Sequence, residues 1–221
     1  MKAMLLAAGR GDRMRPITDN TPKPLINLLG KPIIVHLIEK LAKAGIVDLV
    51  INHSWLGDQI VQRLDTGSAY GVNIEYSPEP QGALDTGGGI VQALRLFGDD
   101  PFIVCNADIW TDYDFSQLPN DIEGRAHLVM IDNPPQHPEG DFVLRDGHLH
   151  CGPGDALTFS GIGMYRADLF KDCRLGKFPL APLLRQAMDH QFVSGEHYRG
   201  QWHDIGTPQR LAELEQQLQG K

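Results

Sequence analysis

The segment LLAAGRGDRMRPITDNTPKP, residues 5–24, decides how the rest of the chain can fold. It begins with a short apolar run that ends at Gly9, and such runs are typical of strands buried in a parallel sheet. Glycine lets backbone N–H groups approach an anion closely, and Arg10, Arg13 and Arg15 add positive charge to the turn. The segment therefore predicts a buried strand followed by a loop suited to a small polyanion.

The charge around this segment is opposite to that of the whole protein. Residues 1–31 hold six basic and two acidic side chains, a local net charge of +4, whereas the 221-residue chain carries −8. A small positively charged region on an otherwise acidic protein favours a small polyanionic ligand. We therefore expect neither nucleic acid nor a membrane as a partner. No apolar run approaches the roughly 18 residues of a membrane span. Cys105, Cys151 and Cys173 are odd in number and widely spaced, which predicts free thiols in a reducing, cytoplasmic compartment.

Two better-known phosphate-binding loops do not account for the turn. The P-loop pattern G-x-x-x-x-G-K-[ST] does not occur there. The dinucleotide fingerprint G-x-G-x-x-G lacks its third glycine at Met14, and no acidic residue follows about 20 positions later. A dinucleotide-dependent oxidoreductase is therefore disfavoured. Arg10-Gly11-Asp12 also spells an adhesion tripeptide, but nothing else in the sequence suggests secretion.

Apolar strands and amphipathic helices alternate along the first half of the chain. Helices are predicted at 32–45, 58–64, 89–97, 179–188 and 208–218, and strands at 48–52, 73–77, 102–105, 127–131, 142–145, 148–151, 157–165 and 197–205. The alternation predicts a single α/β domain, 1–221, with a mostly parallel central sheet and helices on both faces. An Asp146-Gly147 turn predicts a hairpin within a small antiparallel insertion at about 132–159. Ligands bind at the carboxyl ends of strands in such folds, where we expect Gly9, Asn52, Glu79 and Asp108 to converge.

The N-terminal segment resembles the hallmark of sugar-1-phosphate nucleotidylyltransferases, L-A-A-G-x-G-x-R-[LM]-x-P-x-T-x(3)-P-K, at every position from Leu6 to Lys23. The resemblance implies a Rossmann-like fold and transfer of a nucleotidyl group from a nucleoside triphosphate to a sugar 1-phosphate. It implies that Arg13 holds the leaving pyrophosphate and that Lys23 neutralises the α-phosphate and the sugar phosphate. The other nucleotide contacts that it implies in this segment are Ala7, Ala8, Gly9, Gly11 and Asp12. The alternative is a tight strand–helix turn with incidental basic residues.

The same resemblance implies a Mg²⁺ site made by two aspartates. In the family, a strand-end aspartate and the aspartate of a late W-x-D-I/V-G-T sequence bind the ion together. Here these are Asp108, in Asn106-Ala107-Asp108, and Asp204, in Trp202-His203-Asp204-Ile205-Gly206-Thr207. Magnesium prefers carboxylate, phosphate and water oxygens, which suits the assignment. The alternative is that each aspartate simply ends a strand and caps a turn.

The stretch EPQGALDTGGG, residues 79–89, resembles the family's base-binding loop, although Asp85 stands where glycine is usual. The resemblance implies nucleotide contacts from Glu79, Gly82, Thr86 and Gly87. Glu79 could accept a hydrogen bond from a base N–H, which uracil, thymine and guanine all offer. The alternative is a plain loop that leads into a helix at Gly89. The D-T-G triplet of aspartic proteases is excluded, because that fold is all-β and needs two such aspartates.

The second half of the chain departs from many family members. The acceptor motif E-K-P is absent, and the corresponding stretch is Cys151-Gly152-Pro153-Gly154. By resemblance the antiparallel insertion binds the sugar. The sugar contacts that the resemblance implies are Asn106, Gly140, Asp141 and Ser160. The chain also ends without a hexapeptide-repeat β-helix, so we expect no acetyltransferase activity.

The D-T-G-G-G segment and Phe159-Ser160-Gly161-Ile162 resemble the short members of the family that act on N-acetylmuramate 1-phosphate in cell-wall sugar recycling. UTP and N-acetylmuramate 1-phosphate are therefore the expected substrates. The alternatives are mannose-1-phosphate guanylyl transfer and glucose-1-phosphate thymidylyl transfer. An inactive regulatory subunit of the same fold is disfavoured, because it would have lost one of Arg13, Lys23, Asp108 and Asp204. A zinc site at His148, His150 and Cys151 is disfavoured for want of a second ligand cluster.

Overall fold

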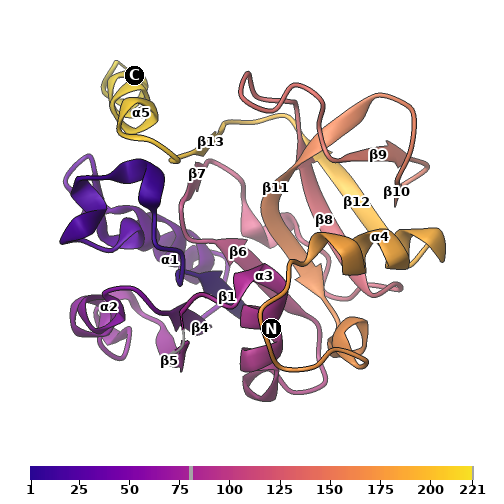
Figure 1. The fold of residues 1–221 in the computed structure, drawn as a ribbon, viewed down its shortest axis with the longest axis horizontal. Helices are drawn as coiled ribbons and strands as arrows, with labels where there is room; N and C mark the ends of the chain where they lie inside the picture. Colours follow the sequence, from indigo (N-terminus) through magenta and orange to yellow (C-terminus); the bar gives the residue numbers. More distant parts are fainter. Residues whose placement is uncertain (80–81, 221) are drawn as a thin grey trace.

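A computed structural model of the protein describes residues 1–79 and 82–220 (Figure 1). In these ranges nine strands form one sheet in the order β5–β4–β1–β6–β11–β8–β12–β10–β9. The strands are β1 (Lys2–Leu6), β4 (Asp48–His53), β5 (Asn73–Pro78), β6 (Phe102–Asn106), β8 (Ala126–Ile131), β9 (Phe142–Arg145), β10 (His148–His150), β11 (Ala156–Tyr165) and β12 (Val193–Tyr198). Two small ribbons stand apart, β2 (Asn27–Leu28) with β3 (Lys31–Pro32) and β7 (Ile109–Thr111) with β13 (Trp202–Asp204).

Parallel pairing is confined to parts of the sheet. Strands β5, β4, β1 and β6 are parallel to one another, and β12 is parallel to β8. Strand β11 runs antiparallel to β6, β8 and β9, and β10 runs antiparallel to β9 and β12. The predicted parallel arrangement is therefore correct for these four strands at one end of the sheet, whereas the sheet as a whole is mixed.

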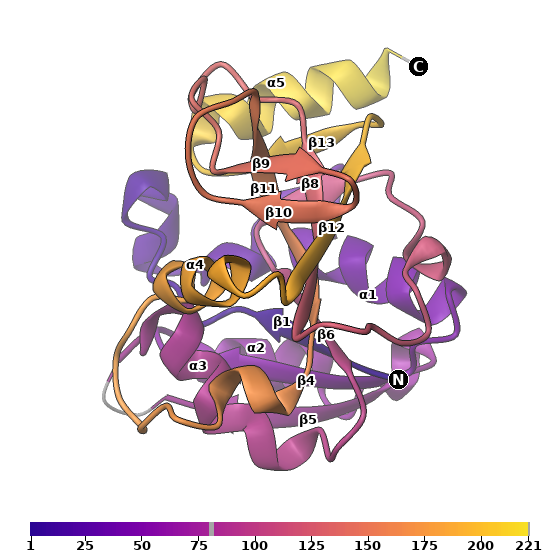
Figure 2. The same ribbon diagram turned by 90° about the vertical axis from the view of Figure 1, so that its right-hand side faces the viewer.

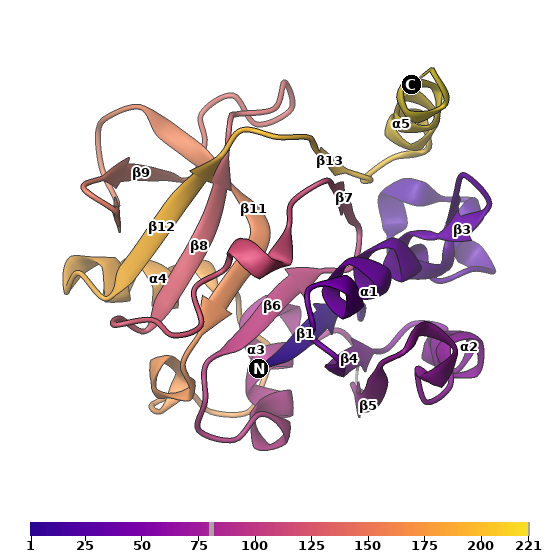
Figure 3. The same cartoon turned by 180° about the vertical axis from the view of Figure 1, so that it is seen from behind.

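Helices cover both faces of the sheet, as predicted. The α-helices are α1 (Ile33–Lys43), α2 (Gly57–Leu64), α3 (Asp85–Ala93), α4 (Ala181–Asp189) and α5 (Pro208–Gln219). Ala3 and Leu5 of β1 pack in one core cluster with α1 and α2, whereas Met4 faces a second cluster with α3 and α4. Figures 1 and 3 show α3 and α4 on one face and α1 on the other. Within the described ranges, no helix has the length and apolar content that crossing a bilayer requires.

A third, smaller core joins the N-terminal segment to the end of the chain. Met14, Ile26 and Leu28 pack with Ile205 and with Leu214 of α5. Helix α5 begins where expected, because the Thr207 hydroxyl accepts a hydrogen bond from the backbone N–H of Arg210 at 3.3 Å. This cluster fixes the basic N-terminal loop against the last strand and the last helix.

The predicted hairpin is present and extends the main sheet. Asp146 and Gly147 connect β9 to β10 with φ angles of 50° and 79°, the left-handed pair that a two-residue hairpin turn requires (Figure 2). Strand β9 also pairs with the start of β11. The stretch 132–159 is thus an antiparallel edge of the sheet. Its assignment to a sugar acceptor stays a prediction.

Two predicted boundaries are wrong for reasons of tertiary packing. Helix α3 begins at Asp85 and not at Gly89, although its first turns are rich in glycine. The chain at 176–178 runs across those turns, and the N–H of Gly88 donates to the carbonyl of Phe178 at 3.1 Å. The strand predicted at 197–205 is two strands, because the chain leaves β12 and β13 then pairs with β7.

We expect Gly88→Ala to destabilise the protein by about 1–3 kcal/mol, as overpacking does, despite the better helix propensity of alanine. A Cβ at Gly88 would lie 2.1 Å from the Gly176 carbonyl oxygen, which is backbone and cannot rotate away. Gly220→Ala is the matched control, since its Cβ would meet its nearest neighbour at 3.5 Å. Urea unfolding measures both, and equal stability of the two variants would contradict this account of the helix start.

Candidate active site

A cleft of about 350 Å³ opens at the carboxyl ends of β1, β4, β5 and β6. The expected convergence of Gly9, Asn52, Glu79 and Asp108 is confirmed, because all four line this cleft. Other side chains that the sequence singled out also line it, namely Ala7, Ala8, Lys23, Thr86 and Asn106. The parallel half of the sheet therefore builds a site where ligands of such folds bind.

A chain of hydrogen bonds holds the walls of the cleft together. The N–H of Ala7 donates to Asn52 Oδ1 at 2.7 Å, and Asn52 Nδ2 donates to Glu79 Oε1 at 2.7 Å. The N–H of Leu84 donates to Glu79 Oε2 at 2.7 Å. Asn52 and Glu79 are 3% and 2% exposed, so the chain is shielded from water. The ends of β1, β4 and β5 and the start of α3 are thus fixed relative to one another.

Glu79 is a buried acid with two protein donors. Burial raises the pKa of Glu79, and the hydrogen bonds from Leu84 and Asn52 partly offset that rise because they favour the carboxylate. A Cβ on Gly89 would lie 2.8 Å from both Glu79 Oε1 and Asn52 Nδ2, so glycine lets α3 sit directly on this pair. Each oxygen of Glu79 already accepts one protein N–H, and a base contact would use a remaining lone pair.

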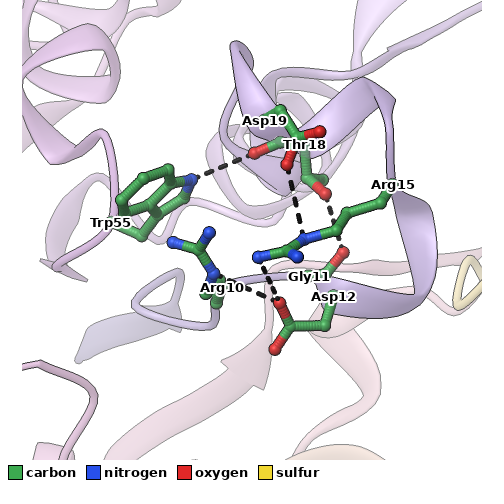
Figure 4. Close-up of polar contacts among 7 residues, drawn as sticks. All are labelled: Arg10, Gly11, Asp12, Arg15, Thr18, Asp19 and Trp55. Carbon is green, nitrogen blue, oxygen red and sulfur yellow. Dashed lines mark hydrogen bonds and ion pairs between the residues drawn. The ribbon is translucent and has the colours of Figure 1, made fainter.

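The glycine loop is folded onto the residues that follow it. Gly11 has a φ of 72°, and a Cβ there would lie 3.0 Å from Thr18 Cγ2 and 3.1 Å from Lys23 Cβ. The Thr18 hydroxyl donates to the Gly11 carbonyl at 2.8 Å (Figure 4). Glycine is required here both for the left-handed backbone and for the close approach of Lys23.

Two of the three arginines in the loop are held by carboxylates (Figure 4). Asp12 Oδ1 lies 3.2 Å from Arg10 Nε and 3.2 Å from Arg15 Nη2. The Arg10 guanidinium also stacks on Trp55, with its central carbon 3.7 Å from the ring centroid. Among the described residues no carboxylate lies within 4 Å of the Arg13 guanidinium, and this side chain is exposed. Asp12 and Arg13 do not line the cleft.

Lys23 is the buried cation of the cleft. It is 7% exposed, and its ammonium group contacts Asp108 Oδ2. A buried ammonium requires a charged or polar partner, and Asp108 supplies one directly after β6. The pair therefore presents opposite charges side by side in the lining of the cleft.

Asp204 approaches Asp108 through the backbone but has its own partner. Strand β13 pairs with β7, and the N–H of Ile205 donates to the Asp108 carbonyl at 3.0 Å. Asp204 Oδ2 accepts from Arg210 Nη1 at 2.6 Å, and Asp204 lines a neighbouring cavity of about 500 Å³ rather than the cleft.

The two carboxylates fit a divalent cation in their chemistry, since Mg²⁺ takes oxygen ligands. Within residues 1–79 and 82–220, no three His, Cys, Asp or Glu side chains gather as a metal-binding group. The remaining ligands would therefore have to come from substrate oxygens or water.

The other predicted contacts serve packing in this structure. Gly87 is buried, and a Cβ there would lie 2.4 Å from the Phe178 ring. The Asp141 carboxylate accepts the N–H of Phe159 at 2.8 Å, and the Ser160 hydroxyl accepts the N–H of Ile162 at 3.1 Å. A Cβ on Gly140 would lie 2.7 Å from the carbonyl oxygen of Ala156. These residues, like Gly11, Gly82 and Asp204, lie outside the cleft lining, and their ligand contacts stay predictions.

Sequence reasoning did not assign two charged residues of the cleft to the site, Asp85 and Lys177. Lys177 lines the cleft from the segment before α4 and is exposed. Backbone hydrogen bonds of the next residue fix this segment, since Phe178 N–H donates to the Leu84 carbonyl at 3.1 Å. No motif marks Lys177, because the contact joins parts of the chain that are about 90 residues apart. Pro80 and Gln81 of the predicted base-binding loop lie outside the described residues.

Comparison with known proteins agrees with this geometry. The family model described as nucleotidyl transferase matches residues 2–144, which include the glycine loop, β6 and every cleft-lining residue named above except Lys177. The chain belongs to the nucleotidyl transferase family. The predicted family membership is thus confirmed.

Similar proteins match the chain over nearly its full length. It is 51% identical to the N-acetylmuramate alpha-1-phosphate uridylyltransferase of Neisseria meningitidis serogroup B, over 97% of each chain. The enzyme of the same name from Caulobacter vibrioides is 32% identical, over 98% of this chain and 96% of that one. A mannose-1-phosphate guanyltransferase of Hypocrea jecorina is 40% identical over 94% of this chain and 61% of its own length.

Two solved structures share the fold. A Bacillus anthracis protein with a provisional assignment as glucose-1-phosphate thymidylyltransferase superposes with a TM-score of 0.86 at 22% identity, over 98% of this chain and 94% of that one. HddC of Yersinia pseudotuberculosis superposes with a TM-score of 0.78 at 21% identity, over 98% and 99%. At these identities the likeness establishes the fold alone.

We expect Glu79→Gln to destabilise the protein by about 1–3 kcal/mol, because a carboxamide cannot accept from both the Asn52 side chain and the Leu84 N–H. Glu75→Gln is the matched control, since Glu75 lies on β5, the strand that ends just before Glu79, and its side chain is exposed. Denaturant titration gives both free energies of unfolding. A Glu79 variant as stable as the control would show that the buried hydrogen-bond chain does not fix the cleft.

Proposed function

We propose that the protein transfers a uridylyl group from UTP to N-acetylmuramate α-1-phosphate in cell-wall sugar recycling in the cytoplasm. The relative from Neisseria meningitidis supports this, because it bears that activity in its name and matches the chain at 51% identity from end to end. The cleft supports it as well, since Lys23 and Asp108 line the same pocket as the start of the glycine loop.

The reaction joins two anions, so the residues of the cleft act by charge and alignment. A phosphate oxygen of the sugar attacks the α-phosphorus of UTP, the bond to the bridging oxygen breaks, and pyrophosphate leaves. Lys23 neutralises the α-phosphate and the incoming phosphate. Arg13, whose guanidinium has no carboxylate partner among the described residues, holds the leaving pyrophosphate.

Asp108 and Asp204 are the residues that would hold Mg²⁺. When bound, the ion supplies positive charge to the phosphate oxygens and favours departure of pyrophosphate. Asp108 is suited to this role because it lines the cleft beside Lys23. The pairing of β13 with β7 brings the backbone that carries Asp204 close to Asp108. Asn106 and the insertion at 132–159 are proposed to contact the sugar.

Mannose-1-phosphate guanylyl transfer is the second candidate. The Hypocrea jecorina relative, at 40% identity over 94% of this chain, is the observation that favours it. The proposed roles of Lys23, Arg13 and Asp108 are the same for both reactions, because these residues act on phosphates and metal and not on the base or the sugar ring.

A substrate matrix tests the proposal. With UTP and Mg²⁺, we expect kcat/KM for N-acetylmuramate 1-phosphate to exceed that for N-acetylglucosamine 1-phosphate by at least about 10-fold, or roughly 1.4 kcal/mol, because a pocket built for the lactyl group leaves the smaller sugar poorly packed. Pyrophosphate release is the measurement, and excess EDTA should abolish it. A best rate with GTP and mannose 1-phosphate would replace the first candidate by the second.

Lys23→Met should lower kcat/KM by about 100-fold or more, comparable to losing one strong transition-state donor. Lys31→Met is the matched control, since Lys31 is a half-exposed lysine that pairs with Glu39 at 2.6 Å outside the cleft. Steady-state kinetics and melting temperatures are measured together. Near-normal turnover by the Lys23 variant would exclude its role at the phosphates.

A further inference from the structure

The two proposed metal ligands are each paired with a basic side chain of the protein. Asp108 contacts the Lys23 ammonium, and Asp204 accepts from Arg210 Nη1 at 2.6 Å. These four groups carry two positive and two negative charges, so their sum is zero. A divalent cation that arrived alone would meet carboxylates whose charge is already balanced.

The Arg210 contact is built into the local chain. Arg210 stands on the first turn of α5, which the Thr207 cap fixes, and Leu214 packs this helix against Met14 and Leu28. A Cβ on Gly206 would lie 2.9 Å from Arg210 Nη1 and 3.1 Å from both oxygens of Asp204, so glycine makes room for the pair. The side chains of Asp204 and Arg210 are 24% and 25% exposed. The pair is therefore partly shielded and preorganised.

A nucleoside triphosphate changes this charge balance. It carries about four negative charges, and its phosphate oxygens are strong acceptors for ammonium and guanidinium groups. Arg210 cannot release its partner by losing a proton, because guanidinium stays charged in proteins. The pair with Asp204 therefore opens more readily when another anion attracts Arg210.

We propose that Arg210 is a positioning residue that occupies Asp204 until nucleotide phosphates draw it away, so that the protein retains a divalent cation together with nucleotide and only weakly without it. The inference rests on the proposed function, because it takes Asp108 and Asp204 as the metal ligands.

Binding of Mn²⁺ to the nucleotide-free protein tests the inference without any turnover. The electron paramagnetic resonance signal of unbound Mn²⁺ gives the dissociation constant at low salt. We expect Arg210→Gln to bind Mn²⁺ on the order of 10-fold more tightly than the wild type, because one competing unit charge is removed at contact distance. Arg210→Lys keeps the charge and should stay within about 2-fold of the wild type. Arg185→Gln is the matched control, an exposed arginine of α4 away from the cleft.

Two further arms make the result decisive. In an Asp204→Asn background, Arg210→Gln should give no tightening, which shows that Arg210 acts through Asp204. The second arm adds a UTP analogue whose α–β bridge is a methylene group, and the Mn²⁺ bound by the analogue itself is subtracted. The Mn²⁺ dissociation constants of the wild type and Arg210→Gln should then agree within about 3-fold, because the phosphates hold Arg210 in the wild type. Should Arg210→Gln fail to fold, Arg210→Met takes its place under the same criteria.

The inference would be overturned if Arg210→Gln left the Mn²⁺ affinity of the nucleotide-free protein unchanged or weaker. It would also be overturned if the variant kept its full, roughly 10-fold tighter Mn²⁺ binding in the presence of the analogue. A different result would contradict the proposed function: the wild-type protein would release no pyrophosphate with any substrate pair. The two failures are separable because the first measurement uses neither substrate nor turnover.

Discussion

The buried hydrogen-bond chain through Asn52 and Glu79 is the constraint on which the cleft depends. It ties the ends of β1, β4 and β5 to the start of α3, and each contact is 2.7 Å long. Burying a carboxylate that is only 2% exposed costs free energy unless hydrogen-bond donors satisfy it. Glu79 therefore requires Asn52 and the backbone of Leu84 to stay in hydrogen-bonding position. The part of the cleft lined by Ala7, Asn52 and Glu79 is thereby fixed before any ligand arrives, which is the preorganisation that charge-based catalysis needs.

Glycine serves close approach at this site as much as backbone freedom. Gly87, Gly88 and Gly89 lie inside α3, where each costs up to about 1 kcal/mol of helix propensity. Their missing side chains make room for Phe178, for the Gly176 carbonyl and for the Asn52–Glu79 pair. The helix can therefore lie against the cleft on one side and against the segment that presents Lys177 on the other. A pattern that resembles a flexible loop in sequence is in fact a helix that packing imposes.

The sequence predicts the first half of the fold well because its signals there are local. Periodic apolar positions mark α1, and buried runs mark β1, β4 and β6, each flanked by its own turn residues. The second half depends on contacts between distant segments: β11 enters antiparallel beside β6, and the chain after β12 leaves the sheet to pair with β7. The site follows the same division. Lys23 and Asp108 stand in motifs and line the cleft, whereas Lys177 arrives through non-local packing and has no signature of its own.

Charge pairing explains how an acidic protein maintains a basic loop. Arg10 and Arg15 both form ion pairs with Asp12. Lys23 is paired with Asp108, and Arg210 is paired with Asp204. The pairs with Asp12 and Asp108 place carboxylates beside the cations of the loop and reduce the repulsion between these cations, and each carboxylate gives its partner a defined position. In the proposed function, a polyphosphate would exchange one anionic partner for another, so it would not have to order freely moving side chains. Arg13 differs, because no carboxylate among the described residues lies within 4 Å of it, and it can therefore meet a phosphate without first breaking an ion pair.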